Sequence, residues 1–326
     1  MLRRVALALA LSAALTGCGA LGGGEPGGKE EHPAPGGKVE KPKIKVALIS
    51  TIDLAPLYLA DKKGYFKEEG LELEIVTLPS SQVTLTSLIS GQADFAFASY
   101  VPFFVAQDKK AADIKIVADS VSASPRSNMI VTKPGSAVKS VRDLAGKKIG
   151  VSALNTASHI MSMAAMKAND VDQREVKWTP IPFPDMAAAL SRGDVDAAYL
   201  PEPFITQAAK TIGAVPIADV ATGPTEDFPI AGYGALAKFA AGNPKTVTAF
   251  QHAMKKATDE SADRAAIQPY VVEFGKVDQD TAALVTLPNF HSTLDARRLQ
   301  RVPDQLLEFH VIGNRIDVGP MLAPQG

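Results

Sequence analysis

Leu88–Ala96 (LISGQADFA) and Leu190–Ala198 (LSRGDVDAA) decide the fold expected for this chain of 326 residues. Both segments read L-x-x-G-x-x-D-x-A. In each, the glycine follows a short helical stretch, at the position where helices commonly end with a positive φ. The aspartate then opens a predicted strand. Because each copy occupies the same point of its own helix–strand unit, the sequence predicts two similar α/β domains.

Short strands alternate with helices around both copies. Around the first, strands are predicted at 44–50, 71–78, 94–98 and 114–121, and helices at 55–69, 83–89 and 101–108. Around the second, strands are predicted at 147–152, 176–182, 196–200 and 215–218, and helices at 157–168, 185–192 and 203–211. This alternation is typical of βαβ crossovers and parallel pairing.

The last part of the chain does not repeat this unit. It reads as a long strand at 228–238, a mostly helical stretch at 243–310, and a loose end at 311–326, where prolines interrupt any regular pattern. A chain that builds one lobe, crosses to a second and returns has two connecting segments. We expect these at Ser127–Lys133 and Ala221–Tyr233.

The expected domain boundaries follow from these crossings. Lobe 1 comprises residues 43–130 and 225–326, and lobe 2 comprises residues 131–224. Two crossings form a hinge, and the cleft between two lobes is a common place for a small-molecule site.

The N-terminus has the features of a targeting segment. Arg3 and Arg4 precede an apolar stretch at Val5–Leu15, which as a helix reaches only about 16 Å against a hydrocarbon core of ~30 Å. This predicts a secretory signal peptide at residues 1–17. The following Cys18 ends LTGC, which resembles the bacterial lipobox, so we expect it to be lipidated and to anchor a Gly/Pro-rich tether at residues 18–42. A free cysteine beside an ordinary signal peptide is the alternative.

Composition excludes several classes of protein. With 34 Lys+Arg against 35 Asp+Glu the net charge is −1, which is too close to neutral for a nucleic-acid-binding protein. One cysteine excludes an internal disulfide, a Cys-rich zinc site and an iron–sulfur cluster. The sequence has no G-x-x-x-x-G-K-[ST], G-x-S-x-G or H-E-x-x-H motif. We therefore expect no enzymatic activity, no cofactor and no metal site.

Three further stretches carry a family resemblance. Pro56–Ala60 (PLYLA), Gly64–Leu71 (GYFKEEGL) and Asp143–Val151 (DLAGKKIGV), together with the two repeats, resemble the NMT1/THI5-like and SsuA/TauA-type substrate-binding proteins of ABC importers. The resemblance covers about residues 43–310 and includes the order of the motifs. It implies a type II periplasmic-binding-protein fold: two α/β lobes, joined by a two-segment hinge, that close on a ligand. Members recognise pyrimidine precursors of thiamine, sulfonates, nitrate and similar nutrients.

Candidate ligand-binding residues lie where predicted strands end, because ligands of open α/β sheets meet the loops at the carboxyl ends of the strands. In lobe 1 the candidates are Thr51, Asp53, Ser80, Ser81, Gln82, Ser99 and Tyr100. In lobe 2 they are Asn155, Thr156, Ser158, His159, Tyr199 and Glu202. Near the crossings they are Arg126, Asn128 and Tyr233.

Each strong candidate has a second interpretation. Asp53 either pairs with a cationic ligand or caps the helix that follows it. Glu202 either contacts ligand or favours the first turn of the next helix through the helix dipole. Tyr199 and the Ser99–Tyr100 pair either offer a hydroxyl and a ring face to the ligand or pack between the lobes. Asn155–Ser158 either binds an anion through backbone N–H groups or only caps its helix.

The charges of these candidates favour one ligand class. Asp53 and Glu202 suit a nitrogenous ligand similar to a thiamine precursor, whereas a sulfonate or nitrate binder would use a cation such as Arg126. The sequence thus predicts a monomeric extracytoplasmic lipoprotein, anchored in the membrane, that delivers a small nutrient to an ABC permease driven by a separate ATPase. The alternatives are a secreted enzyme of the THI5-like branch, whose fungal members use a cysteine-rich site that the mature domain lacks, and a sensor for a membrane receptor.

Overall fold

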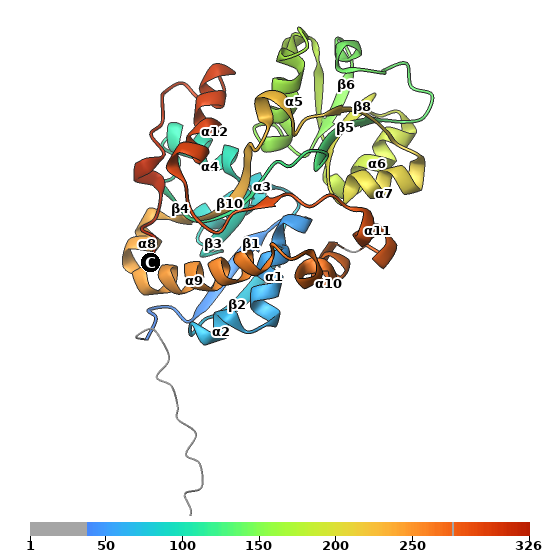
Figure 1. Ribbon diagram of the computed structural model, residues 1–326. Helices are drawn as coiled ribbons and strands as arrows, with labels where there is room; N and C mark the ends of the chain where they lie inside the picture. The colour runs from blue at the N-terminus through green and yellow to red at the C-terminus, as the bar shows by residue number, and fades with distance from the viewer. Residues whose placement is uncertain (1–37, 276) are drawn as a thin grey trace, which may run out of the picture. The chain divides into compact units, whose positions relative to one another are not determined.

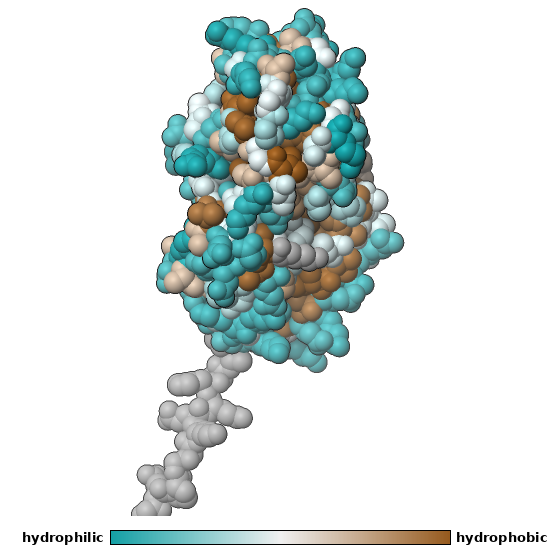
Figure 2. All heavy atoms as spheres, turned by 90° about the vertical axis from the view of Figure 1, so that its right-hand side faces the viewer, coloured by the Kyte–Doolittle hydropathy of each residue, from teal (hydrophilic) through white to brown (hydrophobic). Residues whose placement is uncertain are grey.

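Figure 1 shows two sheets with helices on their faces in the computed structural model, which describes residues 38–275 and 277–326. The predicted signal peptide, the predicted lipidation site Cys18 and most of the predicted tether lie outside the described residues. In the described part of the chain, no helix combines the length and the apolar character that crossing a bilayer requires. On the face shown in Figure 2, hydrophobic residues form separate groups with hydrophilic residues between them.

The first sheet has the strand order β11-β4-β10-β3-β1-β2. Its strands are β1 (Lys43–Leu48), β2 (Glu72–Thr77), β3 (Phe95–Ser99), β4 (Ile114–Ser122), β10 (Pro229–Leu236) and β11 (Asn289–Phe290). Its helices include α1 (Ala55–Lys62), α2 (Tyr65–Glu68), α3 (Ser81–Ile89), α4 (Tyr100–Asp108), α8 (Ala237–Gly242), α9 (Pro244–Glu260), α10 (Arg264–Gly275), α11 (Gln279–Leu284) and α12 (Ala296–Glu308). We call this part lobe 1.

The second sheet has the order β7-β6-β8-β5-β9. Its strands are β5 (Asn128–Thr132), β6 (Lys148–Val151), β7 (Lys177–Pro180), β8 (Ala197–Pro201) and β9 (Val215–Asp219). Its helices are α5 (Ala157–Lys167), α6 (Phe183–Arg192) and α7 (Phe204–Ile212). We call this part lobe 2.

The two sheets share one topology. Strands β2-β1-β3-β10-β4 correspond in order to β7-β6-β8-β5-β9, and in both cases the strand that follows a crossing is inserted beside the third strand. The expectation of parallel pairing is right for β1, β2, β3 and for β6, β7, β8. It is wrong for β4 and β9, which pair with β10 and β5, because β10 and β5 run antiparallel to both of their neighbours. These two strands arrive from the other lobe instead of through a βαβ crossover, so the rule for crossovers does not set their direction.

The repeated motif has the same conformation and makes the same hydrogen bond in both lobes. Gly91 and Gly193, at the ends of α3 and α6, have φ of +72° and +80°. The carboxylate of Asp94 accepts the N–H of Lys45 at 2.9 Å, and that of Asp196 accepts the N–H of Lys148, also at 2.9 Å. Each aspartate therefore ties the loop before the third strand to the start of the first strand, which confirms the prediction of two similar α/β domains.

Two expectations about element boundaries need correction. The helix predicted at 55–69 is broken into α1 and α2, because Gly64 takes a left-handed conformation with φ of +80°. The predicted crossing at Ser127–Lys133 contains strand β5, so a boundary at residue 130 would fall inside a strand. We therefore propose that the lobes are joined by residues 123–127 and 220–228.

Both ends of the described chain pack on lobe 1. At the start, the Glu40 carboxylate accepts the N–H of Thr246 at 2.9 Å, so a tether as far as residue 42 is too long. The predicted loose end is also wrong. Val318, Met321 and Ala323 are buried, and Leu322 forms a bridge to β4. The prolines of this segment interrupt regular structure without preventing its apolar residues from packing.

Candidate functional site

A pocket lies between the two lobes, with about 550 Å³ of non-atom space that includes open solvent. A cleft of this kind is a common place for a small-molecule site. Residues at the end of β1, β3, β6 and β8, or just after it, contribute to its wall, as expected where strands end. The predicted residues that line it are Thr51, Asp53, Ser81, Ser99, Asn128, Thr156, Ser158, Tyr199 and Glu202.

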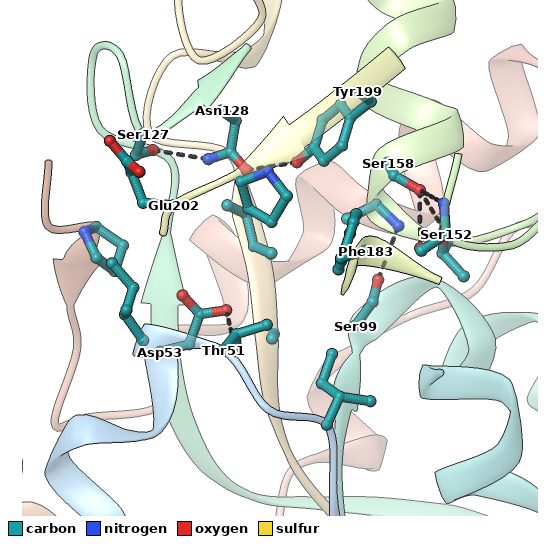
Figure 3. A pocket seen from close by; sticks show the side chains of 18 of the residues that line it. Thr51, Asp53, Ser99, Ser127, Asn128, Ser152, Ser158, Phe183, Tyr199 and Glu202 are labelled. Carbon is teal, nitrogen blue, oxygen red and sulfur yellow. Dashed lines mark hydrogen bonds between the residues drawn. The ribbon is translucent and has the colours of Figure 1, made fainter. Parts of the chain in front are cut away.

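Asp53 presents a poorly solvated carboxyl to this pocket (Figure 3). The Thr51 hydroxyl donates to its Oδ2 at 3.1 Å. Burial raises its pKa to about 6, and the hydrogen bonds from Thr51 and from its own N–H oppose this rise only in part. Helix α1 begins at Ala55 without a side-chain cap, so the capping interpretation of Asp53 is not what the structure shows.

Glu202 lines the pocket and also supports the start of α7. Its Oε2 accepts the N–H of Thr206 at 3.1 Å, and its Oε1 accepts the Thr206 hydroxyl at 2.9 Å. The N–H of Thr286, from lobe 1, donates to the same Oε1 at 3.4 Å. Burial raises the pKa of Glu202, while these donors act in the opposite direction. The carboxylate is therefore shared between the first turn of α7, the other lobe and the pocket.

Ser99 joins the two lobes directly. Its Oγ accepts the N–H of Val101 at the start of α4, at 3.3 Å. It also accepts the N–H of Ala157 at the start of α5 in lobe 2, at 3.0 Å. The Ser99 N–H donates to Ser81 Oγ at 3.0 Å, so the backbone here is fixed as well.

Tyr199 contributes a ring rather than a free hydroxyl. Its hydroxyl donates to Asn128 Oδ1, and the Asn128 amide donates in turn to Ser127 Oγ at 2.7 Å. The Phe183 ring lies near the Tyr199 ring with centroids 6.3 Å apart (Figure 3). These aromatic side chains give the lobe 2 wall an apolar surface suited to a flat ligand.

Seven candidate ligand residues do not line this pocket. Ser80 caps α3 by accepting the N–H of Val83 at 3.4 Å. The Tyr100 hydroxyl donates to Asp119 inside lobe 1. Asn155 occupies a left-handed turn with φ of +54°. Tyr233 is fully buried and packs against Phe97 and Phe250, and its hydroxyl has no hydrogen-bond partner among the described residues. Gln82, His159 and Arg126 also lie outside the lining.

Four polar or aromatic lining residues were missed from the sequence: Ser127, Ser152, Phe183 and Thr286. Ser152 directly follows β6, so the rule that selected Thr51 after β1 could have found it. Ser127 and Phe183 stand just before β5 and at the start of α6. Thr286 lies in an irregular segment after α11, where no sequence pattern marks it.

The lining is acidic and rich in hydroxyl groups. Among the described residues, the side chains that line the pocket include Asp53 and Glu202 but no lysine, arginine or histidine. Five serines and three threonines line the same pocket. In residues 38–275 and 277–326, no three His, Cys, Asp or Glu side chains gather into a group that could hold a metal ion. The arrangement suits a ligand with positive charge or several N–H donors.

Comparison with known proteins places the chain in a family. The model of the family described as NMT1/THI5 like matches residues 51–265, which is most of the folded part. The chain belongs to the NMT1/THI5-like family. A similar relative is the 4-amino-5-hydroxymethyl-2-methylpyrimidine phosphate synthase of Aspergillus parasiticus, 28% identical over 67% of this chain and 66% of that protein. The match to this relative thus covers just under two thirds of its length.

Solved structures share the fold of this NMT1/THI5-like protein. The alkanesulfonate-binding protein SsuA from Xanthomonas axonopodis pv. citri, bound to MOPS, has a TM-score of 0.75 at 18% identity, over 88% of this chain and 99% of that one. The periplasmic nitrate-binding protein NrtA from Synechocystis PCC 6803 has a TM-score of 0.68 at 16% identity, over 83% and 82% of the two chains. The type II periplasmic-binding-protein fold expected from the resemblance is confirmed.

Proposed function

We propose that this protein is the extracytoplasmic solute-binding component of an ABC import system and that it captures a small nitrogenous compound between its lobes. The observation that carries the ligand class is the charge of the pocket. Asp53 and Glu202 line it without a basic residue among the lining side chains. A sulfonate or nitrate would meet two carboxyl groups and no cation among the described lining side chains, and like charges oppose binding in a poorly solvated pocket.

The comparisons support this proposal at the level of fold and family. The structural neighbours named above bind small anions, but at 16–18% identity they share the fold and not the lining. The Aspergillus relative is named for an aminopyrimidine product. An aminopyrimidine has N–H donors for carboxylates and a flat ring for the Tyr199 and Phe183 wall, so this class fits the pocket chemistry.

Delivery and anchoring complete the proposal. The sequence has no P-loop, so a separate ATPase supplies the energy of import. A lipid on Cys18 and a tether ending near residue 38 keep the folded part close to a membrane permease. The protein acts as a monomer, and it binds its ligand without turning it over.

The test is a thermal-shift screen followed by calorimetry. The ligands are 4-amino-5-hydroxymethyl-2-methylpyrimidine, other 4-aminopyrimidines, methanesulfonate, nitrate and bicarbonate. We expect an aminopyrimidine to raise the melting temperature, because a ligand that binds only the folded state stabilises it. Asp53→Ala should weaken the binding of the aminopyrimidine at least tenfold. It should leave the binding of anions unchanged or make it tighter.

Asp113→Ala is the matched control, because Asp113 is an exposed acid outside the pocket lining. This variant should bind as the unaltered protein does. Tighter binding of sulfonate or nitrate than of every aminopyrimidine would refute the ligand class. Release of a new product from any bound compound, followed by mass spectrometry, would favour the enzyme alternative.

A further inference from the structure

Helix α5 begins on the wall of the pocket. Thr156, Ala157 and Ser158 all line it, with Thr156 in the N-cap position. The start of an 11-residue helix normally offers unpaired N–H groups and the positive end of the helix dipole. These features attract anions, so this stretch is where an oxyanion would be expected to bind.

Side chains of the protein already occupy donors of this segment. The N–H of Ser152 donates to Ser158 Oγ at 3.1 Å, and the N–H of Asn155 donates to His159 Nδ1 at 3.2 Å. Both acceptors belong to lobe 2. The N–H of Ala157, the first residue of α5, donates instead to Ser99 Oγ from lobe 1, and Figure 3 marks this bond beside Ser99.

The surroundings of Ser99 fix its position beside the Ala157 N–H. It is 5% exposed, its N–H donates to Ser81, and its Oγ also accepts the N–H of Val101. A hydroxyl has two acceptor positions and one proton. The starts of two helices use both acceptor positions, so only the O–H remains to meet a ligand. That neutral donor suits a ring nitrogen or a carbonyl oxygen.

We propose that Ser99 determines the charge of the ligand by occupying the N–H at the start of α5, which would otherwise bind an oxyanion. This inference rests on the proposed function, because it assigns the specificity of the same pocket. An anion could reach the Ala157 N–H only by displacing Ser99 and separating the lobes at this point. Asp53 and Glu202 then oppose the anion through their charge, and Ser99 occupies one of the N–H groups that would compensate for them.

Ser99→Ala tests this directly, because it frees the Ala157 N–H without adding charge. Nitrate and methanesulfonate are the probes, with binding measured by calorimetry and thermal shift. We expect Ser99→Ala to bind at least one of them ten times more tightly than the unaltered protein, whereas Ser99→Thr, which keeps the hydroxyl, gains nothing. Circular dichroism checks folding, and Ser99→Cys, with its weak sulfur acceptor, serves if the alanine variant does not fold.

Two controls separate anion exclusion from loosening of the lobes. Gln82→Ala removes another bond between lobes, from Gln82 Nε2 to the carbonyl oxygen of Leu154 at 2.7 Å, and should gain no anion binding. In the double variant Ser99→Ala/Ala157→Pro, residue 157 has no backbone N–H. The gain in anion binding expected of Ser99→Ala should therefore disappear. Proline is tolerated at the first position of a helix, and the extended backbone of Thr156 (φ −130°, ψ 172°) suits a residue before proline.

The inference is overturned if Ser99→Ala gains no anion binding, if the gain persists in the double variant, or if Gln82→Ala gains as much. Tight anion binding by the unaltered protein would overturn it as well. Titration with 4-amino-5-hydroxymethyl-2-methylpyrimidine tests the proposed function, separately from the role of Ser99. Failure of that ligand alone counts against the proposed function, while the comparison of anion binding among the variants still decides the role of Ser99.

Discussion

Replacing Asp53 with asparagine should stabilise the ligand-free protein in a pH-dependent way. The carboxyl lies in the pocket with one side-chain donor, the Thr51 hydroxyl, at 3.1 Å. Burial raises its pKa from the ordinary 3.8 to about 6, which means that the folded state disfavours the charged form. Asparagine keeps the shape and an acceptor oxygen for Thr51 but never carries the charge.

The size and sign of the effect follow from that pKa. A rise from 3.8 to about 6 corresponds to at most roughly 3 kcal/mol, and partial exposure of the side chain reduces it to about 1–2 kcal/mol. The unfolded state loses its proton near pH 4 and the folded state near pH 6. Between these values the folded state binds more protons, so the stability of the unaltered protein falls as pH rises. The variant lacks this loss.

Differential scanning calorimetry from pH 4 to pH 8 measures the prediction. The melting temperature of Asp53→Asn should equal that of the unaltered protein near pH 4 and exceed it by about 2–6 °C at pH 7 and above. Asp113→Asn, which changes an exposed acid, should follow the unaltered protein throughout. The burial argument is refuted if the gain in melting temperature of Asp53→Asn does not vary with pH. It is also refuted if this variant is less stable than the unaltered protein at pH 8.

Three further substitutions test other parts of the structure. Gly232→Ala should destabilise lobe 1 by about 1–3 kcal/mol in urea titrations, because its Cβ would overlap a tyrosine hydroxyl on α4, whereas Gly242→Ala has open space around it. Arg298→Leu should cost about 3–5 kcal/mol by the same measurement, since it leaves its buried ion-pair partner Asp119 without a counter-charge. Cys18→Ser should move the protein from the membrane fraction to the soluble fraction without changing ligand affinity, and its retention in the membrane would contradict the lipid anchor.

The fold was predictable where local sequence determines local geometry. Gly91 and Gly193 end their helices with positive φ, and the aspartates that follow bond to the neighbouring first strands, as their shared spacing suggested. The antiparallel direction of β5 and β10 was not predictable in this way. Their direction depends on how the chain returns from the other lobe, which no short motif records.

The site was predictable only in part, for a related reason. The ends of strands correctly indicated Asp53 and Ser99 as pocket residues, because the carboxyl ends of parallel strands meet at one edge. Side chains along a strand alternate between two faces, however, so Tyr233 turns into the core of lobe 1. Thr286 reaches the pocket from an irregular segment far along the chain, which only the folded structure brings close.

The two carboxyls of the pocket are not equivalent, and this decides how a ligand can drive closure. Glu202 in lobe 2 already accepts three hydrogen bonds, two from Thr206 and one from Thr286 across the cleft, so much of its charge is compensated within the protein. Burial raises the pKa of both carboxyls, but Asp53 in lobe 1 has a single side-chain donor, so its charge is the less compensated of the two. A ligand shifts the lobes toward closure only through contacts that are stronger in the closed form. A cationic group that pairs with Asp53 while its ring contacts the Tyr199 wall of lobe 2 meets this condition, because each lobe supplies a contact that the other cannot.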